Sequence, residues 1–151
     1  MKKEESLVNL LLQKGLTIAT AESCTGGLLA KRITSIPGAS GCFEMGVITY
    51  SNESKIKLLG VNKETLAKFG AVSEQTAREM SIGIKKLSQA DIAVSITGIA
   101  GPGGGTESKP VGLVYVGINN DVYELQFVGD RENIRKSTVD FVLDKILRVN
   151  K

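Results

Sequence analysis

The chain has 151 residues, 42% of them hydrophobic, a size and composition typical of one compact domain with a buried core. Its 19 basic and 16 acidic residues are interleaved and give a net charge of only +3, which does not require a nucleic-acid partner. The absence of histidine excludes serine–histidine and cysteine–histidine catalytic pairs within the chain and disfavours a transition-metal site. A general base would have to be a carboxylate, a lysine or a tyrosine.

The composition also bears on the compartment. No stretch is apolar for long enough to span a bilayer, and the N-terminal residues lack the pattern of a signal peptide. We therefore expect a single cytoplasmic domain over residues 1–151, with no membrane partner. Its two cysteines, Cys24 and Cys42, are expected as thiols, because two cysteines alone make neither a disulfide framework nor a zinc site.

The first quarter of the chain reads as helix, strand, turn and helix. Apolar spacing over Glu4 to Lys14, followed by Gly15, predicts an amphipathic helix with its C-terminal stop. The run Leu16 to Ala21 is typical of a short strand, and Leu28 to Ile36 has the spacing of a helix face. Ser23 to Gly27 are then a strand-to-helix turn.

This turn places a hydroxyl and a thiol where an apolar run meets two glycines. Glycine lets the backbone approach a ligand closely, and the free N–H groups at a helix start favour a phosphate or a developing oxyanion. These residues allow two interpretations. In one, Ser23 is a nucleophile; in the other, either Ser23 or Thr25 caps the following helix.

The middle of the chain continues the alternation of strands and helices. Ile36 to Gly41 interrupts regular structure, and the β-branched and aromatic run Phe43 to Tyr50 predicts a strand. Ser51 or Asn52 then caps a helix that ends at Gly60 with Leu58 and Leu59 on its apolar face. A short helix is expected over Asn62 to Lys68, and Ser73 caps a longer helix with apolar positions Ala77, Met80, Ile84 and Leu87.

Three strands and a helix are predicted for the remainder. Ala90 to Thr97 is a buried-type strand that runs into the glycine-rich segment Gly98 to Gly105. Val111 to Ile118 and Val122 to Val128 are strands joined by a hairpin at Asn119 to Asp121. The final helix begins at an Asp130 cap, with Ile134, Val139, Val142, Ile146 and Val149 toward the core. The pattern predicts an α/β fold with crossover connections and a C-terminal antiparallel hairpin.

Three side chains near predicted strand ends form a candidate catalytic trio. Ligands of layered α/β sheets gather where strands enter loops, and Ser23, Tyr50 and Lys55 all lie at or just past such ends. A desolvated lysine can deprotonate serine, and tyrosine can protonate a leaving group. The alternatives are a solvated lysine and a packing tyrosine. Cys24 is a rival nucleophile, but a buried structural cysteine is the commoner outcome.

The glycine-rich loop from Thr97 to Lys109 is a second feature. It fits neither the dinucleotide fingerprint nor the P-loop, because Lys109 lacks the preceding glycine and a following helix. Its backbone N–H groups could still wrap an anion, with Thr97, Thr106 and Lys109 assisting. The alternative is a flexible surface loop.

A pair of arginines opens the last helix. Arg131 and Arg135 are four residues apart, a spacing that suits a phosphate clamp. Surface ion pairs with Glu132 or Asp130 are the other interpretation.

Six ordered motifs span nearly the whole chain: Ala21-Glu-Ser-Cys-Thr-Gly-Gly27, Val47-Ile-Thr-Tyr-Ser-Asn-Glu-Ser-Lys55, Gly70-Ala-Val-Ser-Glu74, Thr97-Gly-Ile-Ala-Gly-Pro-Gly-Gly104, Lys109-Pro-Val-Gly112 and Gly129-Asp-Arg131. Together they resemble the successive motifs of the CinA C-terminal domain family. The resemblance implies a three-layer α/β/α sandwich with a mixed sheet, commonly oligomeric, and a nicotinamide mononucleotide amidase with Ser23 as nucleophile beside Tyr50 and Lys55.

The hypothesis from the sequence is therefore acyl transfer on a small nucleotide, with no metal or organic cofactor. Backbone N–H groups near Thr25 to Gly27 would hold the oxyanion. Alternatives are a non-catalytic nucleotide-binding module and an interaction domain for competence or recombination proteins. The predicted oxyanion and substrate contacts are Thr25, Gly26, Gly27, Thr97, Gly98, Gly101, Gly103, Gly104, Lys109, Arg131 and Arg135.

Overall fold

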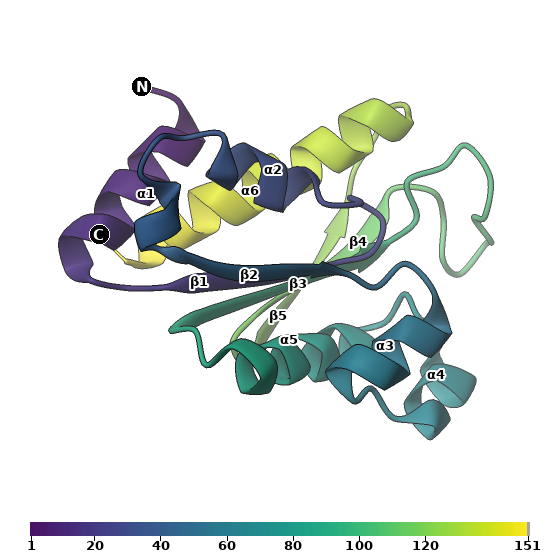
Figure 1. Cartoon of the computed structure of the whole chain (residues 1–151). Helices are drawn as coiled ribbons and strands as arrows, with labels where there is room; N and C mark the ends of the chain where they lie inside the picture. Colours follow the sequence, from purple (N-terminus) through teal and green to yellow (C-terminus); the bar gives the residue numbers. More distant parts are fainter. Residues whose placement is uncertain (151) are drawn as a thin grey trace.

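The computed structural model describes residues 1–150 and contains a central sheet of five strands in the order β2-β1-β3-β4-β5 (Figure 1). The strands are β1 (Ile18–Glu22), β2 (Phe43–Ile48), β3 (Ile92–Gly98), β4 (Leu113–Ile118) and β5 (Asp121–Gln126). The helices are α1 (Lys3–Lys14), α2 (Leu28–Thr34), α3 (Asn52–Leu59), α4 (Lys63–Phe69), α5 (Glu74–Ser88) and α6 (Arg131–Val149), with a 3-10 turn, η1, at Ala39–Gly41.

The sheet is mixed. Strand β1 pairs in parallel with β2 on one side and β3 on the other, whereas β4 pairs antiparallel with both β3 and β5. The turn between β4 and β5 is the predicted hairpin, and Asn119 adopts a positive φ of 55° there. The predicted α/β class with a mixed sheet is confirmed.

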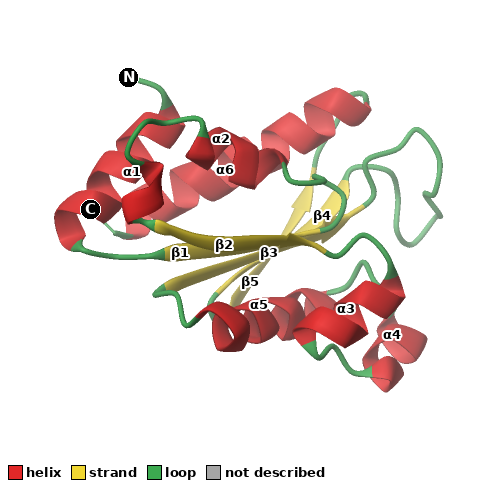
Figure 2. Cartoon of the chain, viewed as in Figure 1, coloured by secondary structure: helices red, strands yellow, loops and turns green. Residues whose placement is uncertain are grey.

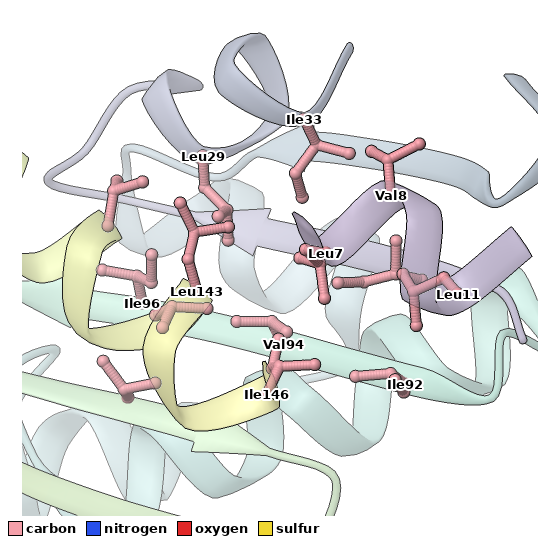
Figure 3. Close-up of a cluster of buried hydrophobic side chains, with 14 of the residues drawn as sticks. Leu7, Val8, Leu11, Leu29, Ile33, Ile92, Val94, Ile96, Leu143 and Ile146 are labelled. Carbon is pink, nitrogen blue, oxygen red and sulfur yellow. The ribbon is translucent and has the colours of Figure 1, made fainter. Parts of the chain in front are cut away.

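Helices cover both faces of the sheet, which gives the expected three layers (Figure 2). Helices α1, α2 and α6 pack together on one face, and α3, α4 and α5 lie on the other. Beneath the first group lies the larger apolar cluster, in which Leu7, Leu29 and Leu143 meet the β3 side chains Val94 and Ile96 (Figure 3). No helix within residues 1–150 has the length and apolar character needed to span a bilayer.

Successive side chains of β1 point to opposite faces of the sheet. Ile18 packs into the cluster under α1, α2 and α6, whereas Ala19 and Ala21 belong to the cluster on the α5 side. Side chains two residues apart share a face, so Glu22 lies on the same side as Ile18, toward α2. All five positions of the strand are buried, which is expected for a strand with neighbours on both sides.

Three predicted apolar positions are not in the core. Leu58, Leu87 and Val149 are 47%, 47% and 68% exposed. Leu87 and Val149 lie in the last turns of α5 and α6, past the last buried residues of these helices, Ile84 and Ile146. Leu58 lies on the outer side of α3, while its neighbour Leu59 is buried as expected. Both cysteines are free thiols, as predicted, and both are buried.

Candidate active site

The turn after β1 is held from beneath by a buried carboxylate. Glu22 accepts hydrogen bonds from the Thr25 hydroxyl at 2.6 Å and from the backbone N–H groups of Leu29 and Ala30 at 2.9 and 3.0 Å. Gly27 precedes α2 with a φ of 97°, a left-handed conformation that favours glycine. The N–H groups of the first turn of α2 therefore bind Glu22, which differs from the expectation that they would receive a phosphate or an oxyanion.

Ser23 and Lys55 meet at the carboxyl ends of β1 and β2. The Ser23 N–H donates to the Ile96 carbonyl at 2.9 Å, which extends the β1–β3 pairing by one residue. Lys55 lies one turn into α3, whose start is fixed by a capping box between Ser51 and Ser54. The Lys55 amine donates to the Ser23 hydroxyl at 3.0 Å and to the Thr49 carbonyl at 2.7 Å.

Burial sets the protonation behaviour of the two titratable neighbours of Ser23. Lys55 is only 1% exposed, and desolvation lowers its pKa. Burial raises the pKa of Cys24 to about 12, so its thiol is neutral near pH 7 and adds no charge beside Lys55. Lys55 therefore loses its proton more readily than an ordinary lysine. Cys24 loses its proton less readily than an ordinary cysteine.

A pocket of about 280 Å³ lies beside Ser23. All three members of the predicted trio line it. The others are Cys24, Asn52, Ala71, Val72, Thr97, Gly98, Ile99, Ala100, Gly101, Gly103, Gly104 and Arg131. The pocket is thus built from the three predicted strand-end loops, with additions from the segment before α5 and the start of α6.

Arg131 ties two sides of this pocket together. Its guanidinium donates to the Gly101 carbonyl at 2.7 Å and to the Tyr50 hydroxyl at 3.0 Å. Tyr50 lies two residues past the end of β2 and is 61% exposed, so this bond holds an otherwise solvent-facing ring against the glycine-rich loop. No carboxylate within residues 1–150 forms an ion pair with Arg131, in contrast to the salt-bridge interpretation of this residue.

Some of the other predicted contact residues line the pocket, and others lie outside it. Thr97 lies in the pocket wall, and its hydroxyl donates to the Ala71 carbonyl at 2.8 Å. Lys109 is outside the pocket and donates to the Phe69 carbonyl at the end of α4. Arg135 donates to the Thr25 carbonyl at 3.0 Å. Arg135, Thr25, Gly26 and Gly27 do not line the pocket; their roles in binding stay predictions.

A protein-family model covers all the elements that build this site. The model of the CinA C-terminal domain matches residues 1–150. The chain belongs to the CinA C-terminal domain family. A CinA-like protein of Kosmotoga olearia is 58% identical over 149 residues, which are 96% of this chain and 36% of that protein. The chain thus spans about a third of the length of this curated relative.

Solved structures of this family share the fold. The competence/damage inducible protein CihA from Agrobacterium tumefaciens is 42% identical, with a TM-score of 0.91 over 100% of this chain and 98% of that one. A CinA superfamily protein from Klebsiella pneumoniae is 36% identical, with a TM-score of 0.94 over 98% and 95% of the two chains. Their names describe competence or damage inducibility and do not state a reaction.

Some residues of the site had no role in the sequence interpretation. Asn52 was considered only as a cap, and Ala71 and Val72 lie in a CinA motif to which no contact was assigned. The position of Glu22 carried a usable signal: a single carboxylate ends an otherwise uncharged buried strand directly before a helix start. Such a carboxylate is expected to accept hydrogen bonds from N–H groups that have no other partner.

Proposed function

We propose that this CinA-family chain is an amidase that hydrolyses the carboxamide of nicotinamide mononucleotide to nicotinic acid mononucleotide and ammonia. The observation that carries the proposal is the 3.0 Å contact between a buried lysine amine and the Ser23 hydroxyl at the pocket wall. A serine needs an adjacent base to act as a nucleophile, and this chain offers no histidine. The family resemblance supplies the substrate.

The first half-reaction is acylation of Ser23. Neutral Lys55 accepts the hydroxyl proton while the oxygen forms a bond to the carboxamide carbon. The negative charge on the amide oxygen needs backbone donors. Cys24 directly follows the nucleophile and lines the pocket, and its backbone N–H makes no hydrogen bond to another residue within residues 1–150.

The second half-reaction releases the products. The carbon–nitrogen bond breaks as the Tyr50 hydroxyl, on the same pocket wall, gives its proton to the departing nitrogen and takes the proton held by Lys55 in its place. Water then attacks the acyl carbon while Lys55 takes one of its protons, and Lys55 returns that proton to the Ser23 oxygen as the ester bond breaks. The acid product leaves and loses its remaining proton to the released ammonia, and serine, lysine and tyrosine regain their starting protonation states.

The assay compares four compounds at matched concentrations: nicotinamide mononucleotide, its riboside, free nicotinamide and NAD. Ammonia release is measured for the native chain and for Ser23→Ala as the matched control. We expect the mononucleotide to be turned over far better than the riboside or nicotinamide, because charge-assisted bonds to phosphate, each about 1.5 to 3 kcal/mol, orient the amide. NAD should be poorer, because its pyrophosphate is esterified and bulkier.

Each outcome has a defined meaning. Equal turnover of nucleotide and riboside would contradict phosphate recognition while leaving the amidase chemistry in place. Absence of Ser23-dependent ammonia release from all four compounds would overturn the amidase proposal. Binding of the mononucleotide without turnover would then favour the nucleotide-binding module.

A further inference from the structure

A second and larger hollow adjoins the candidate active site. It has a volume of about 890 Å³ and lies where the N-terminal end of α1, helix α2 and the first turns of α6 come together. These three helices form one layer on the same face of the sheet (Figure 1). Arg131 lines both this groove and the pocket that contains Ser23. We call this hollow the α1/α2/α6 groove.

The groove concentrates the positive charge of the chain. Seven lysines and arginines line it against three carboxylates, an excess that is larger than the net charge of +3 for the whole protein. Glu4 and Asp140 pair with Arg32 at 2.8 and 2.7 Å, and Asp140 also pairs with Lys136. Lys3 pairs with Asp144 at 2.8 Å.

Four cations of the groove have no ion-pair partner within residues 1–150: Lys2, Lys31, Arg131 and Arg135. The two arginines donate only to uncharged oxygens, namely backbone carbonyls and a phenol hydroxyl. The Nε of Arg135 is buried and has no hydrogen-bond partner within residues 1–150. A buried donor without a partner costs roughly 1–3 kcal/mol, so the described residues leave the hydrogen-bonding capacity of this guanidinium incompletely used.

We propose that the α1/α2/α6 groove binds a small phosphate-bearing anion, held by Arg131, Arg135 and Lys31. Guanidinium groups match the geometry of phosphate oxygens, and lysine adds a point charge. The phosphate has two possible sources. One is the substrate itself, which rests on the proposed function, with the amide at Ser23 and the phosphate past Arg131. The other is a separate phosphorylated molecule that does not react.

A phosphate bound in the groove would change the candidate active site through both arginines. Arg135 holds the carbonyl of Thr25, two residues after the proposed nucleophile, and Arg131 holds Tyr50. A phosphate competing for either guanidinium alters the hydrogen bonds that define these positions.

The binding test uses inorganic pyrophosphate and the whole chain, with calorimetry and no substrate. Lys31 is exposed on α2 and has no assigned catalytic role, so Lys31→Ala should fold normally. Lys63→Ala, at an exposed lysine that opens α4, is the charge-matched control. We expect Lys31→Ala to weaken pyrophosphate binding by about tenfold, the equivalent of one charge-assisted bond, and Lys63→Ala to leave it unchanged.

Kinetics with the same variants separates the two sources. If the substrate phosphate occupies the groove, pyrophosphate competes with nicotinamide mononucleotide, and Lys31→Ala raises KM for the nucleotide but not for the riboside. If a separate anion occupies it, pyrophosphate changes kcat without competing, and Lys31→Ala removes that effect. Absence of pyrophosphate binding, or equal binding by the native chain and Lys31→Ala, would overturn the site. Because binding is measured without turnover, that result would leave the amidase proposal standing.

Discussion

The carboxylate of Glu22 accepts a hydrogen bond from the Thr25 hydroxyl at 2.6 Å across the turn that carries Ser23. The same carboxylate also binds the N–H groups of Leu29 and Ala30, so one buried side chain joins the end of β1 to the first turn of α2. Glu22 is 1% exposed. Its position directly before the proposed nucleophile makes the geometry of the turn depend on this single group.

Replacing Glu22 by Gln should destabilise the protein by about 1 to 3 kcal/mol, because the amide leaves a buried donor group facing N–H and hydroxyl donors. The free energy of unfolding is measured by urea denaturation. Glu44→Gln, at an exposed carboxylate on β2, is the matched control and should change stability by less than about 0.5 kcal/mol. Equal stabilities for the two variants would mean that the Glu22 bonds contribute nothing net.

The pH dependence of turnover should follow Lys55. Burial lowers its pKa below the ordinary value of 10.5, and the neutral amine is the proposed base. The reactive fraction is small below the folded-state pKa and saturates above it, so kcat should rise with pH and then level off. Lys55→Arg should be nearly as inactive as Lys55→Ala, since guanidinium remains protonated. A flat profile, or an active arginine variant, would show that Lys55 acts only as a fixed charge.

Tyr50→Phe should keep the ring on the pocket wall but lose the hydroxyl that accepts from Arg131 at 3.0 Å. Loss of a proton donor to the leaving group typically lowers kcat by about 10²- to 10⁴-fold. The measurement is ammonia release from nicotinamide mononucleotide under saturating conditions. Tyr123→Phe, whose ring packs on Phe141 away from the pocket, provides the comparison and should retain activity. An unchanged kcat for Tyr50→Phe would remove tyrosine from the chemistry.

Cys24 should resist alkylation in the folded protein. Cys24 is 7% exposed, and burial raises the pKa of its thiol to about 12, so the reactive thiolate is scarce at pH 8. Iodoacetamide labelling followed by mass spectrometry should find Cys24 unmodified until denaturant is added. Rapid labelling at pH 8 without denaturant would contradict the assigned environment and restore Cys24 as a rival nucleophile.

The meeting of Ser23 and Lys55 could be predicted from the sequence because it depends on strand order more than on side-chain detail. Both residues follow strands that pair in parallel, and the carboxyl ends of parallel strands meet at one edge of the sheet. Hydrophobic periodicity also predicted every strand and helix, within one or two residues at most ends. These features repeat along the chain and are visible without three-dimensional contacts.

The sequence could not predict which acceptor each long cation finds. Lys109 was expected at an anion, yet it binds the Phe69 carbonyl, one of the carbonyls that a helix end leaves without an intrahelical partner. Arg131 and Arg135 share a helix face, but one reaches the pocket and the other the Thr25 carbonyl. Such choices depend on backbone groups brought together by tertiary packing, which carry no signature in the local sequence.

The identity of the nucleophile is the central claim, and one paired measurement tests it most directly. Ser23→Ala and Cys24→Ala are assayed for ammonia release from nicotinamide mononucleotide, with circular dichroism confirming that both are folded. The account predicts a loss of about 10³-fold or more in kcat for Ser23→Ala and a change of less than about tenfold for Cys24→Ala. An inactive cysteine variant, or a serine variant that retains turnover, would contradict it.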